Sequence, residues 1–193
     1  MNKILLNPFD NLSETKLLFF GLVSFIIGTF AAHFLGGSFP GMMSFKSNEA
    51  TLLQLVYQNV LATFLLSLVI FLLGKILNSR VRFIDMLITV LVARSAIYAM
   101  ALLNTNKWLN PIADLIAKNA LDPKGNQNVD KADLIVLFLG VILILSLLIY
   151  FFYLLIKGFR IAINIKKNYH GLILVLVVFL VEVLFSFFIP YYI

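Results

Sequence analysis

The chain has 193 residues, of which 62% are hydrophobic and 12% are charged, and it contains no cysteine. Soluble domains average roughly 45–50% apolar and about 25% charged residues, so this composition excludes a soluble globular fold and a disordered chain. The lack of cysteine excludes a disulfide scaffold. The sequence therefore predicts an all-α protein, a single polytopic helical bundle over residues 1–193 that is embedded in the lipid bilayer.

Five apolar stretches predict five transmembrane helices. A spanning helix needs roughly 20 mostly apolar residues, because each residue rises about 1.5 Å and the hydrocarbon core is about 30 Å thick. The two long connections, residues 36–51 and 104–133, are predicted outside loops, and residues 110–121 within the second have the apolar spacing of a short amphipathic helix. The predicted spans are residues 17–35, 52–76, 83–103, 134–156 and 172–189.

Lysine and arginine are unevenly divided between the two sides of this predicted bundle. Because basic residues are enriched in cytoplasmic segments, their distribution predicts a cytoplasmic N-terminus and an external C-terminus. The basic inner face also predicts contact with anionic lipid headgroups, so a pI near 9.6 needs no nucleic-acid partner. Nine basic residues lie inside (Lys3, Lys16, Lys75, Arg80, Arg82, Lys157, Arg160, Lys166, Lys167) and five outside (Lys46, Lys107, Lys118, Lys124, Lys131).

Two charged residues, Arg94 and Glu182, lie near the middle of the third and fifth predicted spans. A charge at that depth costs roughly 2.5–3.5 kcal/mol on insertion scales, so each is expected to face the interior of the bundle. Both lie roughly 15–17 Å below the same surface, counted along their helices. We expect an intramembrane ion pair between them, with Tyr98 and Ser186 one turn further on as supporting hydrogen-bonding groups.

The predicted pair has a structural and a functional interpretation. In the first, it fixes which helices are neighbours and in which register. In the second, it marks a proton or ion site, or a polar binding pocket, because ionisable groups inside membranes often line pathways.

Small and hydroxylic residues recur every four positions in the first two predicted spans. This spacing is typical of helices that approach closely and form hydrogen bonds with each other, so we interpret these residues as packing positions. They are Ser24, Gly28 and Ala32 in the first span, and Asn59, Thr63 and Ser67 in the second.

The sequence shows no familiar catalytic or cofactor-binding pattern. It has no His-Glu-x-x-His, no Gly-x-Ser-x-Gly and no phosphate-binding Gly-x-x-x-x-Gly-Lys motif. Its two histidines, His33 and His170, lie too far apart along the chain to predict a metal site. We therefore expect a protein that is not an enzyme and that binds no metal or cofactor, with a lipid-modifying enzyme as the least favoured reading.

Three local features follow one another along the chain: Asn7-Pro8-Phe9 before the first span, Arg80-Val81-Arg82-Phe83 with Asp85 at the third, and a short connection between the fourth and fifth. Together with the five closely spaced spans, these features resemble the Yip family of membrane proteins. The resemblance covers nearly the whole chain from Asn7 onward, and it implies five spans and a cytoplasmic N-terminus. The Asp-Leu-Tyr-Gly-Pro motif of eukaryotic members does not occur, so the resemblance favours a bacterial plasma-membrane protein rather than a Rab-binding one.

Two functional hypotheses follow from these observations. The first is a non-enzymatic, Yip-like adaptor or membrane-organising protein, which binds other membrane proteins or lipid through its basic inner face and its helix surfaces. The second is a small channel or transporter, as a monomer or a homo-oligomer, with Arg94 and Glu182 lining its polar centre.

Overall fold

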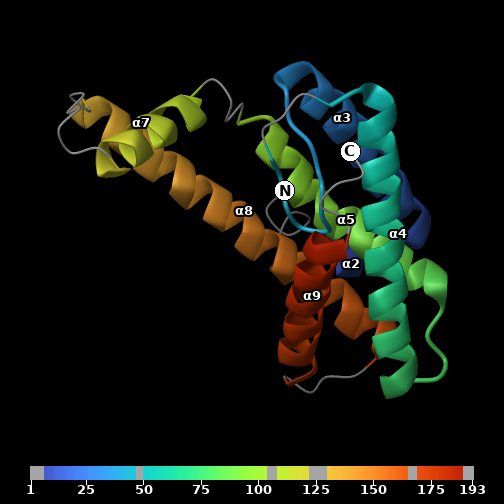
Figure 1. Cartoon of the computed structure of the whole chain (residues 1–193). Coiled ribbons are helices and arrows are strands. Elements are labelled where there is room, and N and C mark those ends of the chain that lie inside the picture. Colours follow the sequence, from blue (N-terminus) through green and yellow to red (C-terminus); the bar gives the residue numbers. More distant parts are fainter. Residues whose placement is uncertain (1–6, 47–49, 104–107, 122–129, 165–168, 189–193) are drawn as a thin grey trace.

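Figure 1 shows the computed structural model of the chain, which describes residues 7–46, 50–103, 108–121, 130–164 and 169–188. Side chains are described for these residues except 119–121 and 185–188. Helices dominate this described part, and its one extended pairing is an isolated bridge between Ser38 and Lys46.

The five apolar stretches form five helices close to their predicted places, so the predicted all-α bundle is confirmed. Four of these helices are long and apolar enough to cross a bilayer, and the fifth, α9, is a shorter apolar helix in its described part. Two further helices are short: α2 (Pro8–Asn11) and α7 (Asn110–Leu121). The five are α3 (Glu14–Leu35), α4 (Leu52–Leu77), α5 (Phe83–Ala101), α8 (Lys131–Ile163) and α9 (Tyr169–Phe188).

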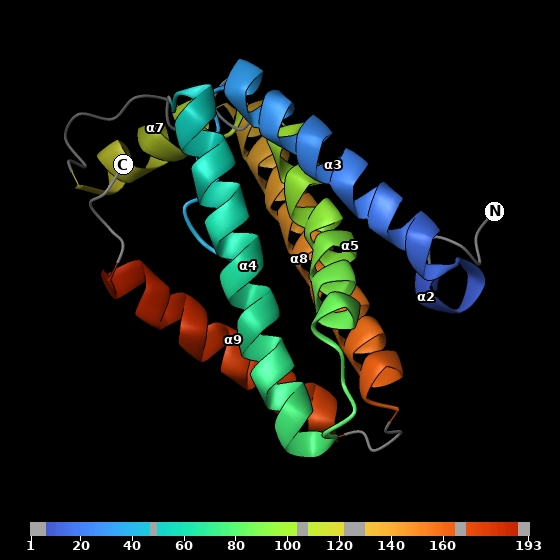
Figure 2. The same ribbon diagram turned by 90° about the vertical axis from the view of Figure 1, so that its right-hand side faces the viewer.

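Helix α5 is the centre of the bundle. It packs against α3, α4 and α8, and Figure 2 shows it between α3 and α8. Its buried residues include Ala93, Ala96 and Ala101, whose short side chains let neighbouring helices approach from several directions. Helix α9 lies outside this group, against α4 and α8.

Helix α8 is longer than the predicted span 134–156. Its 33 residues extend about 50 Å, well beyond the thickness of a hydrocarbon core. The last turns beyond the predicted span carry Lys157 and Arg160. A helix can continue through such residues, because long basic side chains at its C-terminal end reach out of the membrane and interact favourably with the negative pole of the helix dipole. The second half of α8 packs on α5, whereas the first half leaves the bundle with α7 beside it (Figure 1).

The connection after α3 returns into the bundle, although the sequence predicted an outside loop over residues 36–51. Helix α3 ends because Gly36 adopts a positive φ of 68°, which reverses the chain. Ser38 and Lys46 then exchange two backbone hydrogen bonds of 2.7 and 2.9 Å, which close a hairpin over residues 37–46. Phe39 and Met42 in this hairpin are fully buried. We refer to this segment as the re-entrant hairpin.

The start of α3, the end of α4, the start of α5 and the end of α8 lie at the same end of the bundle. An Arg82 Nη2 to Glu14 Oε1 ion pair of 2.8 Å joins α5 to α3 there, and Asn78 Nδ2 donates to the Ile163 carbonyl at 3.0 Å. We refer to this region as the basic end, because it carries the described cations Lys16, Lys75, Arg80, Arg82, Lys157 and Arg160.

Candidate functional site

A polar centre lies on α5 at Arg94, a fully buried side chain. Its Nη2 atom donates to Asn59 Oδ1 at 3.0 Å, and its Nη1 atom donates to Thr63 Oγ1 at 3.1 Å and to the Asn59 carbonyl at 3.4 Å. Asn59 and Thr63 are one turn apart on α4, so both can face the same guanidinium. These bonds let a charged group lie inside the bundle.

Asn59 extends this network to a third helix. Its Nδ2 atom donates to Thr29 Oγ1 on α3 at 2.9 Å, and the same hydroxyl donates to the Phe25 carbonyl at 2.8 Å. One amide side chain therefore joins α3, α4 and α5, because it accepts from Arg94 and donates to Thr29. A buried polar network of this kind fixes which helix faces meet.

Tyr98 contributes its ring to this centre. The Arg94 guanidinium carbon lies 5.4 Å from the centroid of the Tyr98 ring, and this cation–π contact is favourable away from water. The sequence predicted Tyr98 as a hydrogen-bonding group, but its buried hydroxyl has no hydrogen-bond partner within the described part of the chain. The ring is held by Phe25 and Phe39, which meet it edge-on at centroid distances of 6.1 and 5.3 Å.

Glu182 on α9 binds the re-entrant hairpin. Its Oε2 atom accepts the Met42 backbone N–H at 2.7 Å, and the Glu182 side chain is largely buried. Its carboxylate lies directly against Gly41, where an added Cβ would overlap Oε1. Irregular backbone inside a bundle needs internal partners for its polar groups, and Glu182 supplies one of them. Gln58 supplies another, since its Oε1 atom accepts the Phe39 N–H at 3.3 Å.

The structure does not join Arg94 and Glu182 directly, in contrast to the ion pair that the sequence predicted. Ion pairs between described residues connect Arg82 with Glu14 and Asp85, and Arg94 forms none. The physical reason is that the Arg94 guanidinium and the Glu182 carboxylate each form hydrogen bonds with neutral groups close to them instead of with each other. Asn59 and Thr63 hold Arg94, while the re-entrant hairpin meets Glu182 and its Phe39 packs on Tyr98.

The predicted packing positions lie mostly inside the bundle. On α3, Gly28 and Ala32 are buried and Ser24 is half-buried. On α4, Ser67 is buried and donates to the Thr63 carbonyl of its own helix at 2.7 Å. Two of the predicted packing residues, Asn59 and Thr63, are thus the partners of Arg94. The predicted supporting residue Ser186 has no described side chain, so its role falls outside the described residues.

Sequence reasoning missed two residues of this centre, Gln58 and Phe39. A glutamine inside a predicted span was a usable signal, because a polar amide in hydrocarbon needs a partner. Phe39 offered none, since it lies in a Gly-, Ser- and Pro-containing stretch that reads as an exposed turn.

A second polar cluster lies at the basic end. Arg82 donates from Nε and Nη2 to the two Asp85 oxygens at 3.1 and 2.7 Å, and from Nη2 to Glu14. These hydrogen bonds, to Asp85 first and Glu14 second, raise the pKa of Arg82 above its ordinary value, so the guanidinium stays charged at any physiological pH. Within the described residues, no three His, Asp or Glu side chains gather where a metal ion could bind.

Comparison with known proteins gives the family. The Yip1 domain matches residues 5–189, which is nearly the whole chain, and this match confirms the resemblance seen in the sequence motifs. No curated protein and no solved structure matches the chain. Together with the apolar helices, the domain match shows that the chain is an integral membrane protein and belongs to the Yip1 domain family.

Proposed function

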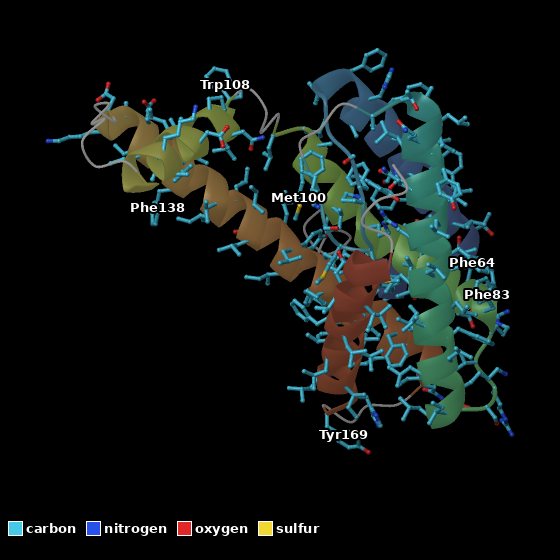
Figure 3. All side chains as sticks on the ribbon, viewed as in Figure 1. Phe64, Phe83, Met100, Trp108, Phe138 and Tyr169 are labelled. Carbon is cyan, nitrogen blue, oxygen red and sulfur yellow. The ribbon has the colours of Figure 1, made fainter. Side chains whose placement is uncertain are left out.

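We propose that this Yip1-family protein is a non-enzymatic membrane protein that binds other membrane proteins within the bilayer. The observation that carries the proposal is an apolar ledge, which consists of α7 and residues 131–149 of α8. The α8 part of the ledge is about 28 Å long, close to the thickness of the hydrocarbon core. Its side chains are largely exposed: Phe138 is 65% and Ile149 69% accessible, and Figure 3 shows Phe138 away from the bundle.

The contrast within α8 supports this reading of the ledge. In the second half of the helix, Phe151, Leu154 and Phe159 are fully buried against the bundle, so that half maintains the fold. The first half contributes far less to packing within the chain, although it is just as apolar. An apolar surface of this length on a membrane protein suits the side of another transmembrane helix.

The closed polar centre supports a binding role over a conducting one. Arg94 has no accessible surface, so no space as large as a water molecule touches it. Its hydrogen bonds go to α4, and aromatic rings cover Tyr98 beside it. We therefore propose that Arg94 and Glu182 have structural roles: Arg94 joins α3, α4 and α5, and Glu182 anchors the re-entrant hairpin.

Photo-crosslinking at the ledge tests the proposal. A photoreactive residue in place of Phe138 is expected to form adducts with other membrane proteins in native membranes. The matched control is the same residue in place of Phe19 on α3, which is 71% exposed and distant from the ledge. We expect protein adducts to be several-fold more abundant at Phe138, because lipid rather than protein surrounds an ordinary exposed position.

Two results would contradict this function. One is an equal yield of protein adducts at the two positions. The other is solute flux through reconstituted vesicles that Glu182→Gln abolishes while the fold remains intact, which would identify a transporter instead. An adduct of twice the chain's mass would identify the bound partner as a second copy.

We further propose that the protein lies in a bacterial plasma membrane. Its basic end faces the cytoplasm and contacts the anionic lipid headgroups of the inner leaflet. Because the chain has no cysteine, single cysteines can report the side of each position. In intact cells, a membrane-impermeant maleimide is expected to label Trp108→Cys, whose parent residue is 64% exposed. Arg80→Cys is expected to react only after permeabilisation. The reverse pattern would invert the proposed orientation.

A further inference from the structure

A pocket of about 300 Å³ lies at the basic end, between α2, α3, α5 and α8. Its rim carries Glu14 and Arg82, whose side chains are 67% and 58% exposed. Its floor is buried and contains Leu17, Ile88 and Thr89. The pocket therefore changes from charged and accessible to apolar and buried within one cavity, which is the pattern expected of a site for an amphiphile.

The rim offers a defined arrangement of charge. Arg82 lies between the carboxylates of Glu14 and Asp85, so the three groups together carry one net negative charge. Arg82 uses Nε and Nη2 for these bonds, and its Nη1 atom makes none to the residues that the structure describes. A guanidinium has five N–H donors, so two remain for a phosphate oxygen. The carboxylates have lone pairs left for an ammonium group.

Phe9 forms an aromatic wall of the same pocket. It belongs to α2 and packs against Gly158 on α8, where a Cβ atom would come within 2.8 Å of the ring. An aromatic ring beside two carboxylates favours a cation, because its face attracts an ammonium group. The short α2 helix therefore completes a rim that suits a positive group next to a phosphate.

The pocket lies at the depth of lipid headgroups. Glu14 is the first residue of α3 and Arg82 directly precedes α5, so the rim marks where two apolar helices begin. Headgroups of a surrounding bilayer lie at this level, with their chains toward the apolar floor. We propose that this pocket binds a zwitterionic phospholipid whose headgroup bears a primary ammonium, of the phosphatidylethanolamine type.

In this complex the headgroup ammonium lies between Glu14, Asp85 and the Phe9 ring, and the phosphate binds Arg82 Nη1. The first carbons of the lipid lie over Leu17 and Ile88. A primary ammonium donates hydrogen bonds to carboxylates, whereas a choline group cannot, so the site prefers the former. An anionic headgroup without a cation meets a rim of net negative charge, which opposes its binding even though the surrounding surface is basic.

Lipid retention by the purified full-length chain tests this site. The protein is reconstituted in nanodiscs with equal parts of phosphatidylethanolamine, phosphatidylcholine and phosphatidylglycerol, then stripped with detergent, and the retained lipid is measured by native mass spectrometry. We expect phosphatidylethanolamine to be enriched by about five- to tenfold over the other two, the effect of one or two charge-assisted hydrogen bonds.

Two variants locate the binding. Glu14→Gln removes one rim charge at an exposed position and is expected to reduce the enrichment by about fivefold. Asp130→Asn, which neutralises an exposed carboxylate at the N-cap of α8, is its matched control and is expected to leave the enrichment unchanged. Ala162→Leu adds side-chain volume to the lining of the pocket and is expected to lower retention while the melting temperature shows a folded protein.

Three outcomes would overturn the proposal. Enrichment of phosphatidylglycerol would show an anion site, and equal enrichment in the Glu14→Gln and Asp130→Asn proteins would show that the rim does not select the headgroup. The third outcome is equal displacement of the bound lipid by soluble phosphoethanolamine and by a short-chain phosphatidylethanolamine. It would show that the apolar floor contributes nothing to the affinity. None of these results depends on whether the ledge binds proteins.

Discussion

Replacement of Asn59 by leucine is expected to destabilise the bundle by about 2–3 kcal/mol. The reason is that Asn59 Oδ1 accepts a hydrogen bond from the fully buried Arg94, and no other group takes its place. Neutral hydrogen bonds between transmembrane helices contribute only about 0.6 kcal/mol on average, but a buried charge that loses an acceptor costs more. Reversible unfolding in mixed detergent micelles measures the difference.

A double mutant separates the charge effect from the loss of packing. When Arg94→Met is combined with Asn59→Leu, the orphaned charge disappears, and we expect part of the lost stability to return. Ser67→Ala is the control on the same helix, because its hydroxyl bonds only to its own backbone, and it is expected to cost less than about 1 kcal/mol. Equal losses in the Asn59→Leu and Ser67→Ala proteins would contradict the proposed role of Asn59.

Replacement of Gly28 by alanine is expected to separate α3 from α5 and to cost about 1–3 kcal/mol. An added Cβ atom would overlap the Cβ and Cγ atoms of Tyr98. The Tyr98 Cβ is attached to the α5 backbone, so a change of rotamer cannot relieve the overlap. The ring would also move relative to Arg94, which lies over it at 5.4 Å. The melting temperature of the purified protein reports this effect.

Gly171→Ala provides the matched control for this prediction. There an added Cβ atom would lie 3.1 Å from the Ile156 Cγ2 methyl and 3.2 Å from Arg160 Nη2, which is the far end of a flexible side chain. The Arg160 end can move away, the methyl contact of 3.1 Å requires a shift of only a few tenths of an ångström, and alanine favours helix over glycine by roughly 1 kcal/mol. We expect Gly171→Ala to be neutral or slightly stabilising. A loss in this protein as large as that of Gly28→Ala would show that close α3–α5 packing is not the cause.

The helices could be predicted because hydrocarbon imposes a simple requirement on length and polarity. All five apolar helices follow from apolar stretches of the sequence, and α7 follows from its amphipathic spacing. Helix α8 continues beyond the predicted span 134–156, because Lys157 and Arg160 look like the start of a connection in the sequence, while their long basic side chains extend from a continuing helix.

The partners of Arg94 could not be predicted from one sequence. Depth along a helix placed Arg94 and Glu182 at the same level, but depth does not say which faces of the helices meet. Asn59 and Thr63 were recognised as interface positions, yet nothing in their spacing distinguishes a packing surface from the acceptor of a buried charge. The choice depends on where α4 lies around α5, and that is a property of the assembled bundle.

The hairpin was missed for a different reason. Its glycines, serines and proline have the composition of a solvent-exposed turn, and no periodic signal marks a segment whose partners are backbone groups. Its burial depends on contacts distant in the sequence, from Gln58 on α4 and Glu182 on α9.

This last contact has a consequence for biosynthesis. The Glu182 carboxylate that accepts the Met42 N–H comes 140 positions later in the chain, within α9. The ribosome makes α3, α4, α5 and α8 before α9, so this hydrogen bond to the hairpin can form only after all four of those helices have been synthesised. During synthesis the chain therefore passes through a stage in which the re-entrant hairpin lacks its partner on α9.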